Sequence, residues 1–597
     1  SKIEELGLLK MDFLGLRTLT VMGDALKLIK ANRGIDLDLD AIPLDDKAAC
    51  ELLTKGDTSG VFQLESDGIT KLVMDLKPEH FEDLIPLVAL YRPGPLGSGM
   101  VADFIDRRHG KKEVAYLHPI LEPILKDTFG VILYQEQVMQ IASAMGGFSL
   151  GQADLMRRAM GKKKESVLKA QRESFIQGSI NNGIEESIAN EVFDLLVYFA
   201  GYGFNKSHSA AYAYIAYQTA YLKAHYFPEF MAATMTSFMQ NMDKLTYYIN
   251  ACKKHNVQVL GPDVNHSLRS FAVQGDAIRF GLGGIKNVGD NAIDRLITER
   301  EANGLYTSIT DFCRRVDSKV VNKRLLESLI RCGAMDGFEE NRNQLLHMYE
   351  SAQAVGAKQQ KDAAMGTMSL FGESTDDVDM IPVPNLPDLS EDDKLKDEKD
   401  YTGFYITGHP LQGYNKELKG LFELGQLLEN PERFDGQTIT FGGLIAERGD
   451  RPTKRGDVMS ILRIEDYSGS AQVVAFPKVF AQSQQFLAVD MVVKVRGRVD
   501  ADEKGVQIIA DRIAPLKVNY NNARQIAIHI RGAYDTPENS NALKEILSQA
   551  EGQVPTALYL HKQRKQINLS PQLCFAPTDE IIARIEAVLG EGAVEVQ

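Results

Sequence analysis

The 597-residue sequence has few cysteines, no long hydrophobic run and no excess of positive charge. Its five cysteines are scattered without a CxxC pair, so we expect reduced thiols, with neither a zinc site nor a disulfide framework. No apolar run approaches membrane-spanning length, and no signal-peptide pattern precedes the first predicted strand. We therefore expect a soluble, cytoplasmic protein without membrane contact.

The formal net charge of −14 at first argues against nucleic-acid binding. The distribution of the charge changes that conclusion, because residues 373–400 hold eleven acidic and three basic residues. More than half of the acidic excess therefore lies in one segment. A basic surface elsewhere in the chain would have to be local, and nucleic-acid binding is not excluded.

A short segment near the N-terminus has the period-two pattern of a β-strand. Leu9, Met11 and Phe13 share one face, which we expect to be buried, while Lys10 and Asp12 share the other. An ammonium and a carboxylate on one polar face are also typical of an exposed ion pair at a sheet edge. Taken alone, this segment assigns no chemistry.

Residues from about 18 to 265 read mostly as amphipathic helices, and two basic features stand out among them. Arg92 precedes Pro-Gly-Pro, for which we expect a rigid turn, and its guanidinium suits either phosphate contact or the capping of a helix end. Residues 157–172 hold seven basic side chains beside Glu165 and Glu173. Such a face is often only solvated, but its charge density also suits phosphates, and we favour binding by Arg157 and Arg158.

A third feature begins at residue 201 with two glycines and continues into a helix that we expect to run through residue 226. Ser207 or Ser209 is predicted to cap this helix. Asn205, Lys206 and His208 place polar donors at the helix start, where backbone N–H groups also attract an anion. The alternative is a plain helix cap with a satisfied histidine.

From about residue 261 the pattern changes to a glycine-bounded hairpin followed by a helix from residue 290 to 301. This arrangement resembles a helix-hairpin-helix, in which hairpin amides and a helix N-terminus bind one backbone phosphate without reading sequence. The candidate contacts are Gly284, Lys286 and Gly289. A flexible glycine loop would look the same in the sequence.

Residues 351–400 lose periodicity and are predicted to form a linker. One apolar island interrupts it, and such an island is either a short partner-binding peptide or a segment tucked back onto its own domain. The island comprises Thr367, Met368, Ser369, Leu370 and Phe371.

The last third turns strongly to β-structure. Between residues 434 and 516, five strand-like runs and a helical interruption near 479–486 predict an OB-fold barrel. Its long first hairpin carries four basic residues, which suit single-stranded template, although many such barrels only dock proteins. The hairpin residues are Arg448, Arg451, Lys454 and Arg455. Residues 524–597 predict a small α+β domain, and from the sequence alone an interaction domain.

The order of these motifs resembles the alpha subunit of bacterial DNA polymerase III from end to end. The match includes the segment around Asp12, the Arg92 loop, the Leu-Met-Arg-Arg-Ala-Met-Gly-Lys-Lys-Lys run at 155–164 and the Gly-Tyr-Gly-Phe-Asn-Lys-Ser-His run at 201–208. The resemblance implies template-directed DNA synthesis by a replicative polymerase. It also implies domain boundaries at 1–17 (last palm strand), 18–265 (fingers), 266–350 (helix-hairpin-helix and clamp-binding domain), 351–400 (linker with clamp peptide), 401–433 (connecting helices), 434–520 (OB-fold) and 521–597 (C-terminal domain).

The resemblance also assigns roles to residues. Asp12 would hold catalytic Mg²⁺ in a two-metal site whose other two aspartates are not in this sequence, and Lys10 would lie near the triphosphate. The fingers residues would contact dNTP and primer–template DNA; they are Arg92, Arg157, Arg158, Lys162, Lys163, Asn205, Lys206 and His208. Residues 367–371 would bind the sliding clamp (beta), although Thr367 replaces the family's glutamine. The C-terminal domain would bind the clamp-loader tau subunit. A proofreading exonuclease would dock only on a missing N-terminal domain.

Three functions compete: a polymerase fragment, a non-catalytic scaffold for DNA and clamp, and another nucleic-acid enzyme such as a nuclease or ligase. The sequence offers no further metal-ligand cluster and no ligase lysine motif, which disfavours the third. The first two differ in whether the missing carboxylates are supplied elsewhere. This fragment alone is expected to be inactive.

Overall fold

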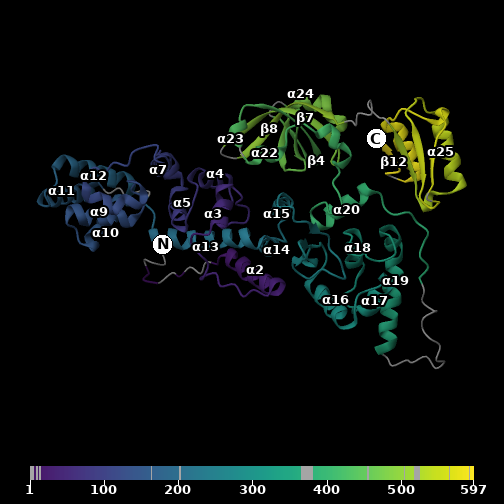
Figure 1. Cartoon of the computed structure of the whole chain (residues 1–597), viewed down its shortest axis with the longest axis horizontal. Helices are drawn as coiled ribbons and strands as arrows, with labels where there is room; N and C mark the ends of the chain where they lie inside the picture. Colours follow the sequence, from purple (N-terminus) through teal and green to yellow (C-terminus); the bar gives the residue numbers. More distant parts are fainter. Residues whose placement is uncertain are drawn as a thin grey trace. The chain divides into compact units, whose positions relative to one another are not determined.

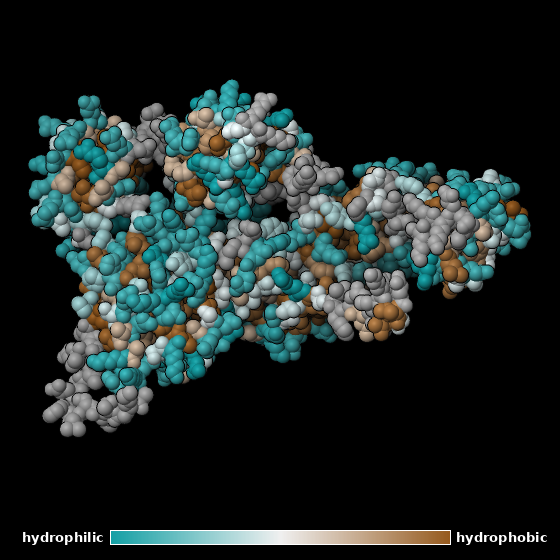
Figure 2. Space-filling model, turned by 180° about the vertical axis from the view of Figure 1, so that it is seen from behind, coloured by the Kyte–Doolittle hydropathy of each residue, from teal (hydrophilic) through white to brown (hydrophobic). Residues whose placement is uncertain are grey.

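The computed structural model describes residues 6–8, 11, 15–97, 99–162, 165–200, 203–364, 381–429, 431–453, 456–502, 505–516, 525–563, 565–590 and 592–596. The chain divides into two compact units, Ser1–Ser237 and Phe238–Gln597 (Figure 1). On the face shown in Figure 2, hydrophilic residues predominate and hydrophobic ones form small patches. Within the described ranges, no helix is both long and apolar enough to cross a bilayer.

The first unit is helical, and its described residues contain no β-strand. Its helices are α2 (Arg17–Arg33), α3 (Lys47–Thr54), α4 (Asp67–Leu76), α5 (Leu84–Leu90), α6 (Pro93–Gly97), α7 (Met100–Arg108), α8 (Glu122–Leu125), α9 (Gln135–Gly146), α10 (Leu150–Lys162), α11 (Glu165–Asn181), α12 (Glu186–Ala200), α13 (Lys206–His225) and α14 (Phe227–Ser237).

Helix α13 is the axis of one half of this unit and packs against α3 and α5. Its 20 residues contain neither glycine nor proline, which favours an uninterrupted helix. It ends at His225, with Tyr226 as its C-cap, just before the proline in the first turn of α14. The side chain of Tyr217 is fully buried and donates to the carbonyl oxygen of Pro43 at 2.6 Å. Helix α13 is therefore fixed to the segment that precedes α3.

Helices α9 to α12 form a second bundle around its own hydrophobic core. Helices α9 and α11 approach closely because each has a glycine at the crossing. A Cβ at Gly178 would lie 2.0 Å from the carbonyl oxygen of Gly146. Any side chain at Gly178 would therefore force the two helices apart.

The predicted strand at the N-terminus is not supported by the described residues. The side chain of Met11, predicted to face a core, is 67% exposed, and Leu6 and Leu8 are exposed as well. An isolated strand is not stable without a neighbouring strand to pair with. The described part of the first unit contains no such strand. Lys10 and Asp12 lie outside the described residues.

The second unit opens with α15 (Met242–Lys254) and a three-stranded sheet of order β1-β3-β2. Strand β1 (Val259–Leu260) runs parallel to β3 (Ala277–Arg279), and β3 pairs antiparallel with β2 (Ala272–Gln274). Helices then follow in succession. They are α16 (Asp290–Asn303), α17 (Ile309–Arg315), α18 (Lys323–Arg331), α19 (Arg342–Ala364), α20 (Glu391–Thr402), α21 (Asn415–Leu418), α22 (Leu424–Glu429) and α23 (Pro431–Phe434).

The predicted linker over 351–400 is wrong at both ends, which are helical. Helix α19 continues to Ala364, and its Gly356 packs directly against the backbone of Cys313 on α17. Helix α20 is acidic, with Ser390 as its N-cap. The buried carboxylate of Glu398 on α20 accepts from Arg342 at 2.8 Å. Composition predicted a linker because the buried Glu398 has the same side-chain chemistry as its exposed acidic neighbours.

Strands 4 to 8 close the predicted barrel, in the order β4-β5-β6-β8-β7. The helical interruption is present as α24 (Pro477–Ser483) and a 3₁₀ turn, Gln484–Phe486. Alternate residues of each strand fill the barrel interior. The strands are β4 (Thr438–Pro452), β5 (Val458–Glu465), β6 (Ser470–Ala475), β7 (Val492–Asp502) and β8 (Gly505–Pro515). The OB-type barrel is confirmed.

The C-terminal part is the predicted small α+β domain, with a four-stranded sheet of order β11-β10-β9-β12. Isoleucines and leucines of the sheet and of the helices share one core. The elements are β9 (Ile526–Ile530), α25 (Pro537–Gln549), β10 (Thr556–Leu560), β11 (Lys565–Asn568), α26 (Asp579–Leu589) and β12 (Val594–Val596).

Candidate functional site

Several sequence-predicted residues cannot be placed. Lys10, Asp12, Lys163 and residues 367–371 lie outside the described residues. Lys162 ends α10, but its side chain is not described either. Among the residues that the structure does describe, no group of three or more His, Cys, Asp or Glu side chains is arranged to hold a metal ion.

The structure brings two other predicted residues, Arg92 and His208, together at the half-buried ring of Phe204. The guanidinium carbon of Arg92 lies 3.6 Å from the Phe204 ring centroid. The His208 ring meets Phe204 edge-on, with 5.3 Å between centroids. On its other side, His208 stacks on Tyr212 at 4.2 Å. Arg92 follows α5, whereas His208 and Tyr212 lie on α13, so distant segments of the chain build this surface.

The backbone before α13 is tied to the start of α9. The N–H of Gln135 donates to the carbonyl oxygen of Phe204 at 2.9 Å, and the N–H of Phe204 donates to that of Leu133 at 3.1 Å. These bonds form an isolated parallel bridge between Tyr134 and Phe204. The Lys206 ammonium then lies 5.6 Å from the centroid of the Tyr134 ring. Burial raises the pKa of Tyr134, so its hydroxyl stays protonated at neutral pH.

The N-terminus of α13 carries an internal carboxylate. Asn205, rather than Ser207 or Ser209, is the N-cap, and its side chain accepts from the N–H of His208 at 2.8 Å. Glu136 on α9 accepts from the Asn205 amide at 2.8 Å and from the N–H of Lys206 at 3.0 Å. The predicted anion position at this helix end is therefore occupied by the protein itself.

We call Arg92, Tyr134, Phe204, Lys206, His208 and Tyr212 the Phe204 cluster. The side chains of Arg92, Lys206 and His208 are exposed. Within the described ranges, none of the three forms an ion pair with a carboxylate. Two permanent cations and a histidine thus face solvent on an aromatic base, which is a surface suited to phosphate groups.

Arg157 and Arg158 have a different environment on α10. Both bind the carboxylate of Asp154, at 2.7 Å and 2.8 Å. Their guanidinium groups hold the pKa of Asp154 below its usual range. The described part of α10 reaches Lys162 and that of α11 starts at Glu165, and the two lysines between them lie outside the described residues. Any phosphate bound by these arginines competes with Asp154.

Pro93 also differs from its prediction. It begins the short helix α6 instead of a rigid turn, because a proline lacks the N–H that the first helical position leaves unpaired.

At the predicted helix-hairpin-helix, the first helix is only a 3₁₀ turn, Leu282–Gly284. Gly284 is buried, and a Cβ there would clash with the Phe280 ring at 2.7 Å. Lys286 is exposed, although its backbone N–H donates to Tyr401 at 2.9 Å. Gly289 is the N-cap of α16 and exposed, so Lys286 and Gly289 are accessible to a phosphate while Gly284 serves packing.

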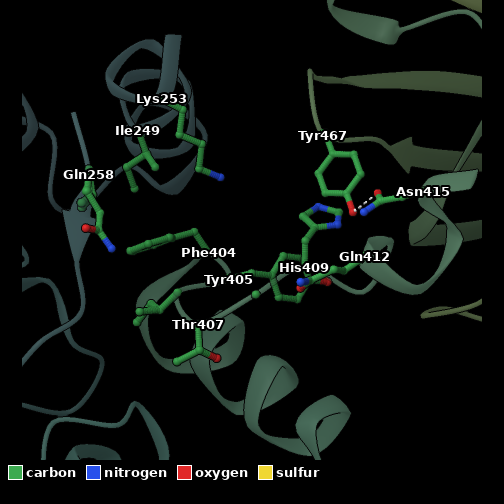
Figure 3. Close-up of a pocket in the computed structure, with 13 residues that line it drawn as sticks. Ile249, Lys253, Gln258, Phe404, Tyr405, Thr407, His409, Gln412, Asn415 and Tyr467 are labelled. Atoms are coloured by element: carbon green, nitrogen blue, oxygen red, sulfur yellow. Dashed lines mark hydrogen bonds between the residues drawn. The ribbon is translucent and has the colours of Figure 1, made fainter. Parts of the chain in front are cut away.

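A pocket of about 430 Å³ lies in the second unit, between α15, the segment after α20 and the β5–β6 turn (Figure 3). The His409 ring packs against the ring of Tyr467 in the turn, with 4.6 Å between the ring centroids. The Tyr467 hydroxyl donates to the side-chain oxygen of Asn415 at 2.9 Å. Burial, with Lys253 and Lys399 nearby, lowers the pKa of His409 to about 4. The imidazole is therefore neutral at pH 7, and its Nδ1 accepts from the N–H of Leu411 at 3.1 Å.

Sequence reasoning missed the roles of Tyr134, Glu136 and Phe204. The spacing within the Tyr-Gln-Glu-Gln run at 134–137 assigns no chemistry and favours a structural role. That holds for Gln137, whose buried side chain accepts from the N–H groups of Leu133 and Tyr134. A glutamate flanked by polar residues at a predicted helix start was the available signal, but it does not show which distant backbone the carboxylate reaches.

Three protein-family models match successive parts of the chain. The family model of the bacterial DNA polymerase III alpha subunit finger domain matches residues 18–183. A helix-hairpin-helix motif matches residues 256–345, and an OB-fold nucleic acid binding domain matches residues 439–516.

Three curated relatives are each named DNA polymerase III subunit alpha. The one from Pasteurella multocida is 41% identical over 616 residues, covering all of this chain and 53% of the relative. The Escherichia coli K12 relative is 38% identical over 615 residues with the same coverage. The Pseudomonas aeruginosa relative is 43% identical over 545 residues, covering 86% of this chain and 46% of the relative. The chain thus spans about half the length of these relatives. By this end-to-end similarity it belongs to the family of the bacterial DNA polymerase III alpha subunit.

Proposed function

We propose that this chain is the DNA- and nucleotide-engaging part of an enzyme for template-directed 5′–3′ DNA synthesis. The observation that carries the proposal is the Phe204 cluster, which lies in a chain similar from end to end to polymerase subunits. In this proposal, Arg92, Lys206 and His208 contact phosphates of the incoming nucleotide or of primer–template DNA.

The chemistry of the cluster supports this role. Arg92 offers a planar set of donors that fits phosphate oxygens, and its position over Phe204 limits the freedom it would lose on binding. Lys206 is a point charge at the start of α13. Because the Lys206 N–H donates to Glu136 and the His208 N–H to the Asn205 side chain, the phosphate contact in this proposal comes from side chains and not from the helix end. Arg157 and Arg158 would join only after exchanging Asp154 for a phosphate.

The proposal includes Mg²⁺, but this chain would supply only part of the metal site. Polymerases of this kind use Mg²⁺ held by a carboxylate cluster. The described residues do not offer such a cluster, and Asp12 lies outside them. The residues present therefore do not fit a complete metal site, and no step is assigned to the metal here. Asp12 would be one ligand, with Lys10 beside it, and the remaining carboxylates would come from residues that this sequence does not contain.

The same proposal extends to protein partners. Residues 367–371 would bind a sliding clamp through Leu370 and Phe371, and the domain from residue 521 would bind the clamp-loader tau subunit. In the sequence, the peptide lies between helices α19 and α20, and it is outside the described residues. A scaffold that binds DNA and clamp without catalysis is the second candidate, favoured because the described residues contain no carboxylate cluster that could hold a metal ion.

The test measures binding of labelled primer–template DNA by the 597-residue chain across a salt series, with primer extension assayed in parallel. In the variant Arg92→Ala/Lys206→Ala, two cations are lost, so we expect the slope of log affinity against log salt to flatten by about 1.8. The matched control is Lys544→Ala/Lys562→Ala, which removes two exposed cations of the C-terminal domain.

The outcomes separate the candidates. Binding without extension supports a fragment whose catalytic carboxylates lie elsewhere. An unchanged slope in the Phe204-cluster variant would refute the assignment of that cluster. Primer extension by the chain alone would refute the conclusion that its metal site is incomplete. Absence of any DNA binding would refute the proposal as a whole.

A further inference from the structure

The barrel carries an exposed row of cations on β7. Along this strand, exposed and buried residues alternate strictly from Val493 to Val499. The valines fill the barrel interior. Lys494, Arg496 and Arg498 point outward and are exposed. Three successive outward positions of one strand are therefore all basic, in a chain whose net charge is −14.

The neighbouring strands extend this row into a surface. On β8, Arg512 lies directly opposite Arg496 and is exposed. On β4, Thr440 lies opposite Arg496 and Thr438 opposite Arg498. Four cations and two hydroxyls thus share the outer wall formed by β4, β7 and β8, which we call the basic wall. Figure 1 labels these three strands of the barrel. Two carboxylates border this wall: Asp511 lies at the bulge of β8 beside Arg512, and Asp500, the next outward residue of β7 after Arg498, accepts from Gln507.

These cations are not used by the fold. Within the described ranges, Lys494, Arg496, Arg498 and Arg512 form no ion pair. Other cations around the barrel are paired: Arg448 binds Asp450 at 2.7 Å, and Lys399 binds Glu465. Four like charges on adjacent strands repel one another, so the fold gains nothing from grouping them. An anionic partner would turn this repulsion into attraction.

The spacing of the row matches a particular kind of anion. Successive outward residues of an antiparallel strand are about 6.8 Å apart, twice the rise per residue. That is close to the distance between neighbouring phosphates along one nucleic-acid strand. A single phosphate or a small anion would engage only one or two of these cations, whereas a phosphate backbone would engage the whole row.

The residue types on the wall favour a duplex. Binding sites for single strands combine cations with aromatic side chains on which unpaired bases stack. The outward residues opposite the row are threonine and glycine on β4 and arginine, alanine and isoleucine on β8, with no aromatic ring among them. The wall therefore suits a backbone whose bases are already paired and stacked. We propose that the basic wall binds the phosphate backbone of double-stranded nucleic acid, without reading its sequence.

This surface differs from the basic first hairpin that the sequence singled out in the barrel. OB-type barrels bind ligands mainly over their second and third strands, here β5 and β6, and at the loops that join strands one to two and four to five. The basic wall lies on the first, fourth and fifth strands instead. The inference goes beyond the proposed function, since it adds a duplex contact that the Phe204 cluster does not supply.

The test compares binding of a blunt duplex by the 597-residue chain and by the variant Lys494→Gln/Arg496→Gln/Arg498→Gln across a salt series. Glutamine keeps much of each side chain's length and removes its charge. If each cation neutralises one phosphate, the slope of log affinity against log salt should flatten by about 2.7. Binding of a single-stranded oligonucleotide of equal length should change much less.

The matched control is Arg531→Gln/Lys562→Gln/Lys565→Gln, which lowers the net charge equally by changing exposed residues of the C-terminal domain. Its slope should remain that of the parent chain. Circular dichroism of both variants checks that the barrel is intact. If the triple variant unfolds, the single variant Arg496→Gln replaces it in the salt series and should flatten the slope by about 0.9.

Equal flattening in the control and the wall variant would overturn the inference, because the effect would then be one of net charge. A larger loss on the single strand than on the duplex would overturn it too. Unchanged duplex binding in the wall variant would refute the basic wall while leaving the Phe204 cluster standing, whereas a parent chain that binds no DNA would refute both.

Discussion

The contact between Glu136 and the start of α13 makes a prediction about local stability. The Glu136 carboxylate accepts from the Asn205 amide at 2.8 Å and from the Lys206 N–H at 3.0 Å, and it faces the positive end of the helix dipole. Replacing it by alanine removes both bonds and the charge. Because Asn205 and Lys206 are exposed, water compensates in part, and we expect a cost of about 2 kcal/mol to the first turn of α13.

Hydrogen–deuterium exchange read by mass spectrometry measures this cost directly. A loss of about 2 kcal/mol corresponds to roughly 30-fold faster exchange, and we expect it in peptides covering residues 203–212. Glu136→Gln should give an intermediate effect, because the amide keeps one acceptor oxygen but loses the charge. Glu191→Ala, which removes an exposed carboxylate of α12, is the matched control and should leave those peptides unchanged.

Two results would refute this reasoning. Unchanged protection at residues 203–212 in Glu136→Ala would mean that Asn205 alone holds the helix start. Equal loss in the alanine and glutamine variants would mean that the charge of Glu136, and hence the helix dipole, contributes nothing.

Two further predictions concern packing and pH. Gly178→Ala should destabilise the α9–α12 bundle by several kcal/mol, because its Cβ would lie 2.0 Å from the Gly146 carbonyl oxygen, and exposed Gly151→Ala on α10 is the control for thermal unfolding. His409 should titrate near pH 4, which histidine exchange mass spectrometry measures; a value near 6.5 would contradict its burial. Since the folded-state pKa lies below the unfolded value, His409 favours unfolding as pH falls from about 6.5 to 4, by at most about 3 kcal/mol, and His409→Gln should remove that dependence from denaturant unfolding curves.

The barrel and the C-terminal domain were predictable because their information is local. Each barrel strand alternates between interior and exterior, and glycine turns separate the strands, so period and spacing alone gave five strands and the helix between the third and fourth. The end helices of the predicted linker were missed for the opposite reason. Glu398 is chemically identical to its exposed acidic neighbours, and only the fold shows that Arg342 makes it a buried anchor.

The Phe204 cluster was predictable in its members but not in its arrangement. Arg92 and His208 were named from local pattern, yet their shared contact with Phe204 joins residues more than a hundred positions apart. Met11 also shows that a local pattern does not reveal which distant residues surround a side chain. Its alternation with Lys10 and Asp12 is that of a strand, but an alternating pattern cannot reveal whether a neighbouring strand exists to bury it.

The position of Glu136 has a consequence for how a nucleic-acid ligand would bind. A helix N-terminus is an anion site only while its N–H groups are free, and in α13 the first of them already donates to a carboxylate. A phosphate approaching the Phe204 cluster would meet Arg92 and Lys206 but also the negative charge of Glu136. Asp154 stands in the same relation to Arg157 and Arg158. In both places the protein holds an internal carboxylate against the cations or donors that a phosphate would use. Binding by Arg157 and Arg158 is therefore an exchange of one anion for another, whereas at the Phe204 cluster the charge of Glu136 opposes the phosphate without pairing with the cations. On the basic wall, no described carboxylate pairs with the cations of β7, so the proposed duplex contact would require no such exchange.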